Sequence, residues 1–113
     1  MKKYEVKITK YALDQMAEIR DYIVYEPLNP DAARDSIEAM QTEIVQLSQM
    51  PERFRPVDEE PWGKRGVRKI MVKNFYAYYW IDEEPAVVHI IAVAYAMRNQ
   101  KMVLKEMDGY HSV

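Results

Sequence analysis

The chain has 113 residues, of which 49% are hydrophobic and 30% charged, and its formal net charge is −2. This composition is typical of a folded domain and excludes a disordered chain. The chain contains no cysteine, which excludes disulfides and thiolate chemistry, and no apolar run approaches the ~18 residues of a membrane span. The sequence predicts one cytoplasmic domain, residues 1–113, without membrane association.

Charge is distributed unevenly along the chain. Residues 51–81 carry seven Lys or Arg against four Asp or Glu, a net charge of +3, whereas residues 1–50 carry −3 and residues 82–113 carry −2. A protein that binds nucleic acid over its whole surface is normally basic overall. We therefore expect any contact with a polyanion to be confined to one face.

The first elements in chain order are a strand and a helix. Residues 4–9 alternate between apolar and polar side chains, which predicts a short, half-buried strand. Thr9 can cap a following helix. That helix is expected to stop by Glu26, because Pro27 disfavours helical geometry in the residue before it.

A second helix follows closely. The string Asn29-Pro30-Asp31 combines an N-cap, a proline at the first helical position and an acid in the first turn, which predicts a helix start. Met50, followed by Pro51, is expected to end this helix. Because the connection between the two helices is short, they are predicted to form an antiparallel hairpin.

The second half of the chain predicts a long loop, three strands and a last helix. The loop covers residues 51–66, which hold three of the six prolines and two of the three glycines. The predicted strands lie at about 67–73, 75–82 and 86–95. A short helix over residues 98–107 and a flexible tail at residues 108–113 complete the chain.

This order predicts an α+β domain. It consists of an N-terminal strand, an antiparallel helical hairpin packed on a mainly antiparallel four-stranded sheet, and a short C-terminal helix. Residues 86–95 form the most continuously apolar segment, so this strand is expected at the centre of the sheet. The sheet face opposite the hairpin is expected to be partly open.

The segment most informative about function reads KRGVRKIMVKNFYAYYWI and carries five positive charges, no acid and a run of aromatic residues. It is interpreted as two strands joined by a tight turn at Lys73-Asn74. Cationic side chains beside stackable rings suit a phosphate backbone and its bases. The candidate nucleic-acid-binding residues are Lys64, Arg65, Lys69 and Lys73.

The aromatic strand presents two rows of side chains by alternation. One row holds Tyr76, Tyr78 and Trp80, and the other holds Phe75, Ala77, Tyr79 and Ile81. One row is expected in the core, and the other is expected to be a stacking platform or a surface covered by a partner. His89 is interpreted as a core histidine. The two histidines and the acids show no metal-ligand spacing, so neither a metal nor another cofactor is expected.

Several strings, together with the order of elements, resemble the RelE/ParE superfamily of toxins from bacterial type II toxin–antitoxin systems. The strings are ALDQMAEIRDYI at 12–23, NPDAA at 29–33, PERF at 51–54, GVRKI at 66–70 and VAY at 93–95, with Arg98-Asn99 after them. The resemblance implies a small toxic protein that is neutralised by a cognate antitoxin in a hetero-oligomer. In this superfamily, RelE-like members cut mRNA on the ribosome, whereas ParE-like members poison DNA gyrase.

RNA cleavage by the 2′-hydroxyl needs a base, an acid and a cation that stabilises the phosphorane. The resemblance assigns the cationic role to Arg68 on the second predicted strand and to Arg98 after the last one. Tyr95 stands at the strand end where many relatives carry His or Tyr, and it is the candidate proton-transfer or stacking group. A structural alternative for Arg68 is an ion pair with an acid of the loop, such as Glu59.

Three positions depart from the nuclease pattern: Met102, Ala96 and Phe75 stand where nuclease relatives carry Tyr or Arg. The helical hairpin and the proline-rich loop look more like the ParE side of the superfamily. The sequence favours ribosome-dependent mRNA cleavage by an endoribonuclease, with gyrase inhibition as the alternative. A catalytically degenerate protein-interaction module is the third hypothesis.

Overall fold

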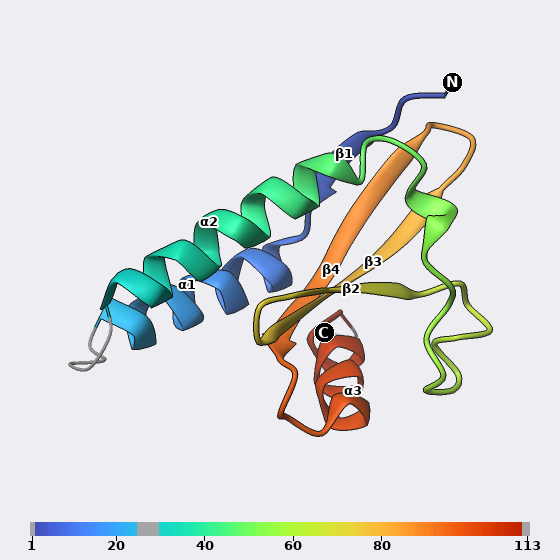
Figure 1. The fold of residues 1–113 in the computed structure, drawn as a ribbon. Helices are drawn as coiled ribbons and strands as arrows, with labels where there is room; N and C mark the ends of the chain where they lie inside the picture. The colour runs from blue at the N-terminus through green and yellow to red at the C-terminus, as the bar shows by residue number, and fades with distance from the viewer. Residues whose placement is uncertain (1, 25–29, 112–113) are drawn as a thin grey trace.

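A computed structural model describes residues 2–24 and 30–111. Its elements are β1 (Glu5–Ile8), α1 (Lys10–Val24), α2 (Pro30–Gln46), the 3-10 helix η1 (Pro51–Arg53), β2 (Arg68–Val72), β3 (Phe75–Asp82), β4 (Val87–Tyr95) and α3 (Gln100–His111). This order confirms the predicted α+β fold (Figure 1). The helix end expected at Glu26 and the N-cap expected at Asn29 lie outside the described residues.

The four strands form one mixed sheet in the order β1-β4-β3-β2. β2, β3 and β4 are antiparallel neighbours, whereas β1 pairs with β4 in parallel. β4 is therefore an inner strand, as its apolar sequence predicts. The tight turn between β2 and β3 is also present, with Lys73 in the left-handed region at φ 56°.

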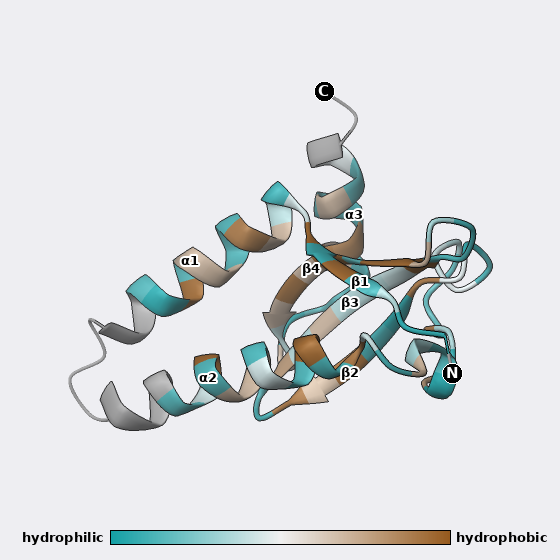
Figure 2. Cartoon of the chain, turned by 90° about the horizontal axis from the view of Figure 1, so that it is seen from above, coloured by the Kyte–Doolittle hydropathy of each residue, from teal (hydrophilic) through white to brown (hydrophobic). Residues whose placement is uncertain are grey.

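The helical hairpin covers one face of the sheet, and Figure 2 shows how hydrophobic and hydrophilic residues alternate along α1 and α2. The apolar stripe of each helix faces the strands. The buried residues of this first core are Tyr4, Ala12, Met16, Ile19, Met40, Ile44, Leu47, Ile70, Val72, Phe75, Ala77, Tyr79, Val88, Ile90 and Val93. With Val6 and Ile8 of β1, which are partly buried against it, the first core draws on all four strands of the sheet.

The expectation of a partly open opposite face is wrong over much of that face. α3 and the loop before β2 cover it and form a second core. Its buried residues are Val57, Trp62, Val67, Tyr78, Ala92, Ala94, Val103, Leu104 and Met107. The Trp62 indole N–H also donates to an Asp108 carboxylate oxygen at 2.9 Å, which joins the loop to α3.

Two helix ends differ from the prediction. α2 ends at Gln46 instead of Met50, because the next N–H groups bond to carbonyls three residues back and the chain tightens into 3-10 geometry. Met50 then adopts a left-handed conformation, φ 46°, that leads into η1. α3 continues to His111, so the first residues of the segment predicted as a tail are helical.

Candidate functional site

Arg68, at the start of β2, binds the loop that follows η1. Its Nη1 donates hydrogen bonds to the backbone carbonyls of Phe54 and Glu52, the latter at 3.3 Å. Pro56 forms an antiparallel β-bridge with Arg68. The guanidinium of Arg68 therefore binds backbone carbonyls of its own chain. The alternative prediction, an ion pair between Arg68 and Glu59, is wrong, because Glu59 pairs with Lys69.

Tyr79, on β3, is part of the first core and also binds η1. Its hydroxyl donates to the Pro51 carbonyl at 2.6 Å, and its side chain is fully buried. Burial raises the pKa of Tyr79 to about 12, although the positive charges of Arg68 and Arg53 oppose the rise. Tyr79 and Arg68 together fix η1 and the adjoining loop against the sheet.

Arg68→Ala is expected to lower the free energy of unfolding by about 1.5–3 kcal/mol, the usual contribution of hydrogen bonds to a charged group. Two loop carbonyls lose their donor in this variant. Urea denaturation measures the change. Arg55→Ala is the matched control, because Arg55 is 82% exposed and is expected to shift stability by less than about 0.5 kcal/mol. Equal midpoints for the two variants would contradict the anchoring role.

Tyr95 and Arg98 are brought together at the other end of the sheet. Both line a cavity of about 340 Å³ between α1 and the end of β4. The Tyr95 ring packs on Phe75 with 4.5 Å between ring centroids. Arg98 Nη2 donates to both carboxylate oxygens of Glu106, at 3.0 and 3.1 Å. The guanidinium is thus held by α3, and Arg98 and Tyr95 share the wall of this cavity.

The structure does not bring Arg68 to this pair. Arg68 begins β2, whereas Val72 at its end is level with Phe75 and hence with Tyr95. Four residues of an antiparallel strand span roughly 14 Å, and β3 separates β2 from β4 by two strand spacings of about 4.8 Å each. Arg98 lies beyond the end of β4. The two guanidinium groups therefore occupy different sites and do not converge on one phosphate position.

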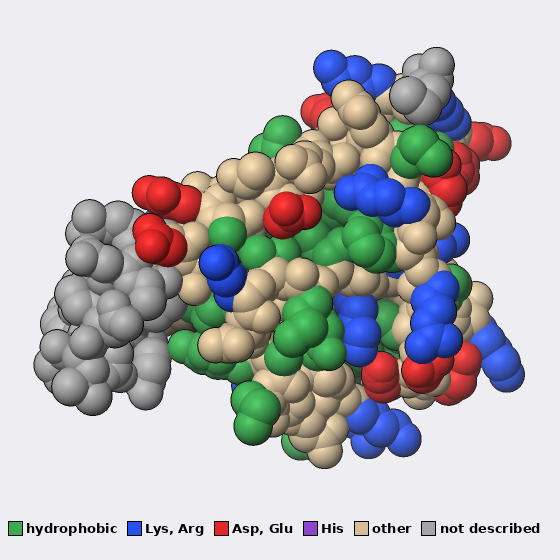
Figure 3. Space-filling view, in the orientation of Figure 1, with side chains coloured by type: hydrophobic (Ala, Val, Ile, Leu, Met, Phe, Trp, Pro, Cys, Tyr) green, Lys and Arg blue, Asp and Glu red, His purple; other side chains and the backbone are tan. Residues whose placement is uncertain are grey.

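Three of the candidate nucleic-acid-binding residues, Lys64, Arg65 and Lys69, lie on β2 or in the loop before it. In Figure 3 most Lys and Arg side chains of the visible face surround β2 and this loop, with acidic side chains beside them. Lys69 Nζ lies 3.8 Å from a Glu59 carboxylate oxygen and 4.2 Å from the Tyr76 ring centroid. Arg65 pairs with Asp108 at 3.4 Å. Acids of the same chain thus neutralise part of this basic surface.

Lys64 and Lys73 are the remaining candidates of this set. Lys64 belongs to the turn that precedes β2, where its backbone N–H donates to Glu60 Oε2 at 3.2 Å. Lys73 is exposed in the turn between β2 and β3. Lys64, Arg65 and Lys69 therefore gather at the start of β2 and in the loop before it. Lys73 lies instead at the end of the sheet that holds Tyr95, because the carbonyl of the neighbouring Asn74 accepts a hydrogen bond from the Ala96 N–H at 2.8 Å.

One aromatic row of β3 packs in the first core, as expected, whereas the other row is mixed: Tyr76 is half-buried, Tyr78 is buried and Trp80 is exposed. The expectation of a stacking platform or a partner-covered surface is therefore wrong at Tyr78. Tyr78 is fully buried in the second core, and its hydroxyl donates to Gln100 Oε1 at 2.5 Å. Burial raises the pKa of Tyr78 well above its ordinary value. Trp80 remains 39% exposed. Its ring stacks on His89 at 5.8 Å. His89 is half-buried and belongs to neither core, so the prediction of a core histidine is wrong.

The sequence matches the family model described as the ParE toxin of the type II toxin–antitoxin system parDE over residues 6–100. The match covers most of the chain, including β1, both helices of the hairpin and the three antiparallel strands. The chain belongs to the ParE toxin family. No protein of curated function matches the sequence.

Solved structures of related toxins share the fold. A chain of the chromosomal ParDE system from P. aeruginosa is similar with a TM-score of 0.66 and 18% identity, over 84% of this toxin and 98% of that chain. A chain of the RelBE2 toxin–antitoxin complex from Mycobacterium tuberculosis gives 0.58 and 22%, over 84% and 93%. An E. coli RelE toxin variant in the free state gives 0.63 and 16%, over 92% and 97%.

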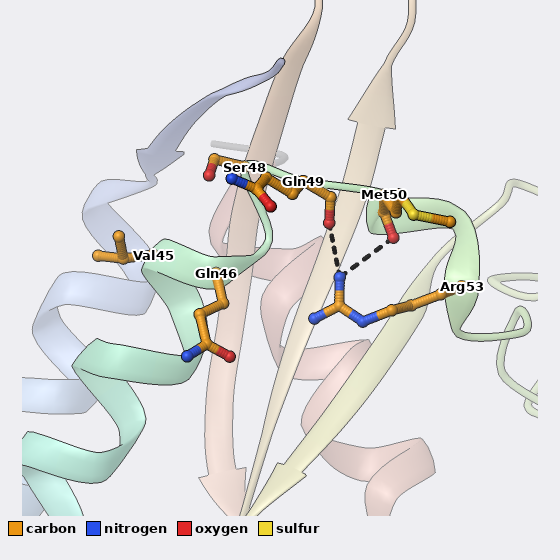
Figure 4. Close-up of a pocket in the computed structure, with 6 residues that line it drawn as sticks. All are labelled: Val45, Gln46, Ser48, Gln49, Met50 and Arg53. Carbon is orange, nitrogen blue, oxygen red and sulfur yellow. Dashed lines mark hydrogen bonds between the residues drawn. The ribbon is translucent and has the colours of Figure 1, made fainter. Parts of the chain in front are cut away.

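Arg53 is a site residue that the sequence did not single out. Figure 4 shows its guanidinium directed from η1 to the segment between α2 and η1, where Nη1 donates to the carbonyls of Gln49 at 2.6 Å and Met50 at 3.2 Å. Together with Val45 and Ser48 these residues line a cavity of about 480 Å³. A basic residue shortly after a helix is a known capping signal, and it could have indicated this contact.

Two further observations concern the described part of the toxin. Within residues 2–24 and 30–111, no group of three His, Cys, Asp or Glu residues is placed to hold a metal ion. None of the helices in these ranges is long and apolar enough to cross a membrane.

Proposed function

We propose that this toxin arrests growth by inhibiting DNA gyrase, as ParE-like members do, and that a cognate antitoxin neutralises it in a hetero-oligomer. The observation that carries the proposal is the match to the ParE toxin model over residues 6–100. The similarity to the ParDE and RelBE2 toxin–antitoxin structures supports an antitoxin partner. Inhibition by binding requires a surface, and it does not require a set of proton-transfer groups.

The positions of the three candidate catalytic residues support gyrase inhibition as the first hypothesis and RNA cleavage as the second. The sequence favours mRNA cleavage because Arg68, Tyr95 and Arg98 match nuclease positions. In the folded chain Arg68 holds backbone carbonyls and Arg98 holds Glu106, at separate ends of the sheet. Phosphorane stabilisation requires preorganised cations at one point. The geometry therefore favours gyrase inhibition over RNA cleavage.

The test is inducible expression of the toxin, followed by parallel measurement of DNA synthesis and protein synthesis. We expect DNA synthesis to stop first, and the purified toxin to inhibit supercoiling by purified gyrase. Co-expression of the short protein encoded by the neighbouring reading frame should restore growth and copurify with the toxin. Early arrest of translation together with cleaved mRNA, and unimpaired gyrase, would refute the proposal.

Ribosome-dependent mRNA cleavage is the second candidate function. The observation in its favour is that Tyr95 and Arg98 line one cavity. If this function holds, Tyr95→Phe and Arg98→Ala should each reduce mRNA cleavage in a ribosome assay. Gyrase inhibition should then be absent from the unmodified toxin.

A further inference from the structure

The inner strand β4 extends beyond the end of β1. The last paired residue of β1 is Ile8, which is level with Ile90, and the Thr9 N–H donates to the Ile90 carbonyl at 2.9 Å before α1 begins. β4 continues for five more residues, to Tyr95, with β3 on one side. On the other side of this extension, no strand lies among the described residues.

A bulge sets the direction of the backbone groups in this extension. Tyr78 is level with Ala92 and Tyr79 with Ile90, so Ile91 is the extra residue of β4. Beyond the bulge, the Ala96 N–H donates to the Asn74 carbonyl on the β3 side at 2.8 Å. The N–H and C=O groups of successive residues point alternately to the two sides of a strand. Beyond the bulge, the N–H and C=O groups of odd-numbered residues such as Val93 therefore point to the side that lacks a strand.

A side chain of α1 occupies the place of the missing strand. Gln15 Oε1 accepts a hydrogen bond from the Val93 N–H at 2.7 Å. An amide oxygen offers the same acceptor chemistry as the backbone carbonyl of a neighbouring strand. The cavity of about 340 Å³ lies at this point, between α1 and the end of β4, and Glu18 and Ile19 form part of its wall. The groove is therefore a gap in the sheet that Gln15 partly fills.

The charges around the groove are mostly negative. A second cavity, of about 420 Å³, shares Gln15, Glu18 and Arg98 with the first and adds Asp14 and Glu106. Three carboxylates thus face one guanidinium, and that guanidinium is already bound to Glu106. Complementarity of charge favours a ligand that carries cationic side chains.

We propose that this groove binds an extended, basic segment of a partner protein, which adds to β4 beside Val93 and displaces the Gln15 side chain. Main-chain hydrogen bonds to the strand edge supply affinity in such strand addition, and alternate side chains supply specificity. Here a Lys or Arg side chain of the segment pairs with Glu18. About three residues of the segment, roughly 10 Å, match the length of the gap. The inference does not depend on the target of the toxin.

The probe is a synthetic peptide of alternating lysine and valine with blocked ends, compared with the same peptide carrying glutamate in place of lysine. Titration of the isotope-labelled toxin is followed by NMR. We expect the lysine peptide to shift the resonances of the Val93 amide and the Gln15 side-chain amide. The glutamate peptide is expected to bind about tenfold more weakly.

Two charge reversals test the location of the site. Glu18→Lys should weaken binding of the lysine peptide about tenfold, whereas Glu43→Lys, at an exposed position of α2, should leave it unchanged. The NMR spectra show whether each variant is folded. Equal binding of both peptides, shifts that spare Val93 and Gln15, or equal weakening by both variants would overturn the proposal. Because the titration involves no gyrase, its failure leaves the proposed function standing.

Discussion

Leu104→Ala is expected to lower the free energy of unfolding by about 2–5 kcal/mol, the usual cost of a buried leucine truncation. Leu104 lies on α3, is completely buried and belongs to the second core. A domain of this size is normally stable by about 5–15 kcal/mol, so the loss is a large fraction of the total. Urea denaturation measures it, and amide hydrogen exchange shows whether the protection of α3 falls first.

Met102→Ala is the matched control for Leu104→Ala. Met102 lies on the same helix but is 49% exposed, so its truncation is expected to change stability by less than about 0.5 kcal/mol. Both variants keep helix propensity, since alanine is the best helix former. If Leu104→Ala and Met102→Ala unfold at the same urea concentration, the second core does not hold α3 to the sheet.

Stability is expected to fall steeply as the pH rises from about 10 to about 12, because buried tyrosines must ionise. Burial raises the pKa of Tyr79 to about 12 from an ordinary value of about 10. The folded state therefore keeps a proton that the unfolded state loses, so the stabilisation is complete below pH ~10 and is lost as the pH passes ~12. The loss of stabilisation from Tyr79 alone is about 3 kcal/mol.

Tyr4 is also expected to lower the stability of the folded state at alkaline pH. Its hydroxyl donates to Glu83 Oε2 at 2.8 Å, and this hydrogen bond, followed by burial and the charge of Glu83, raises the pKa of Tyr4 to about 12. Alkaline loss of stability is thus expected on both sides of the first core, at the start of β1 and on β3.

Tyr79→Phe tests the assignment of the alkaline transition. This variant should be less stable at neutral pH by about 1–3 kcal/mol, because the Pro51 carbonyl loses its donor. Its stability should then decline less than that of the unmodified toxin between pH ~10 and ~12. Urea denaturation at several pH values measures both effects. If the stability of both proteins falls equally between pH ~10 and ~12, Tyr79 does not contribute to the alkaline loss of stability.

Much of the fold follows from local sequence patterns. Alternation and β-branched residues locate the strands, and the prolines locate the long loop. Tight turns are equally local, so the Lys73-Asn74 connection between β2 and β3 is predictable. Helix ends are less predictable. α2 ends at Gln46, before Pro51, because the N–H groups that follow it bond to carbonyls three residues back. The covering of the second sheet face depends on contacts of Trp62 with α3, distant in the sequence.

The candidate site shows the same division. Residue types and spacing identify the basic and aromatic segment, and the resemblance identifies Arg68, Tyr95 and Arg98. Neither reveals that Arg68 is bound to loop carbonyls, since that contact joins residues 14 and 16 positions apart. Nor does the pattern of β3 show that Tyr78 and Tyr79 are both buried. They belong to the cores on opposite faces of the sheet, and segments distant in the sequence cover those two faces.

The family, the order of elements and the central place of β4 can be predicted from the sequence, because these depend on periodicity, turn residues and the spacing of residue types within short segments. Only the tertiary structure decided which cations lie together, which tyrosines are enclosed, and where β4 lacks a neighbour. These properties depend on strand register and on the length of β1 relative to β4. Register is a relation between distant segments, and no local pattern of residues encodes it alone.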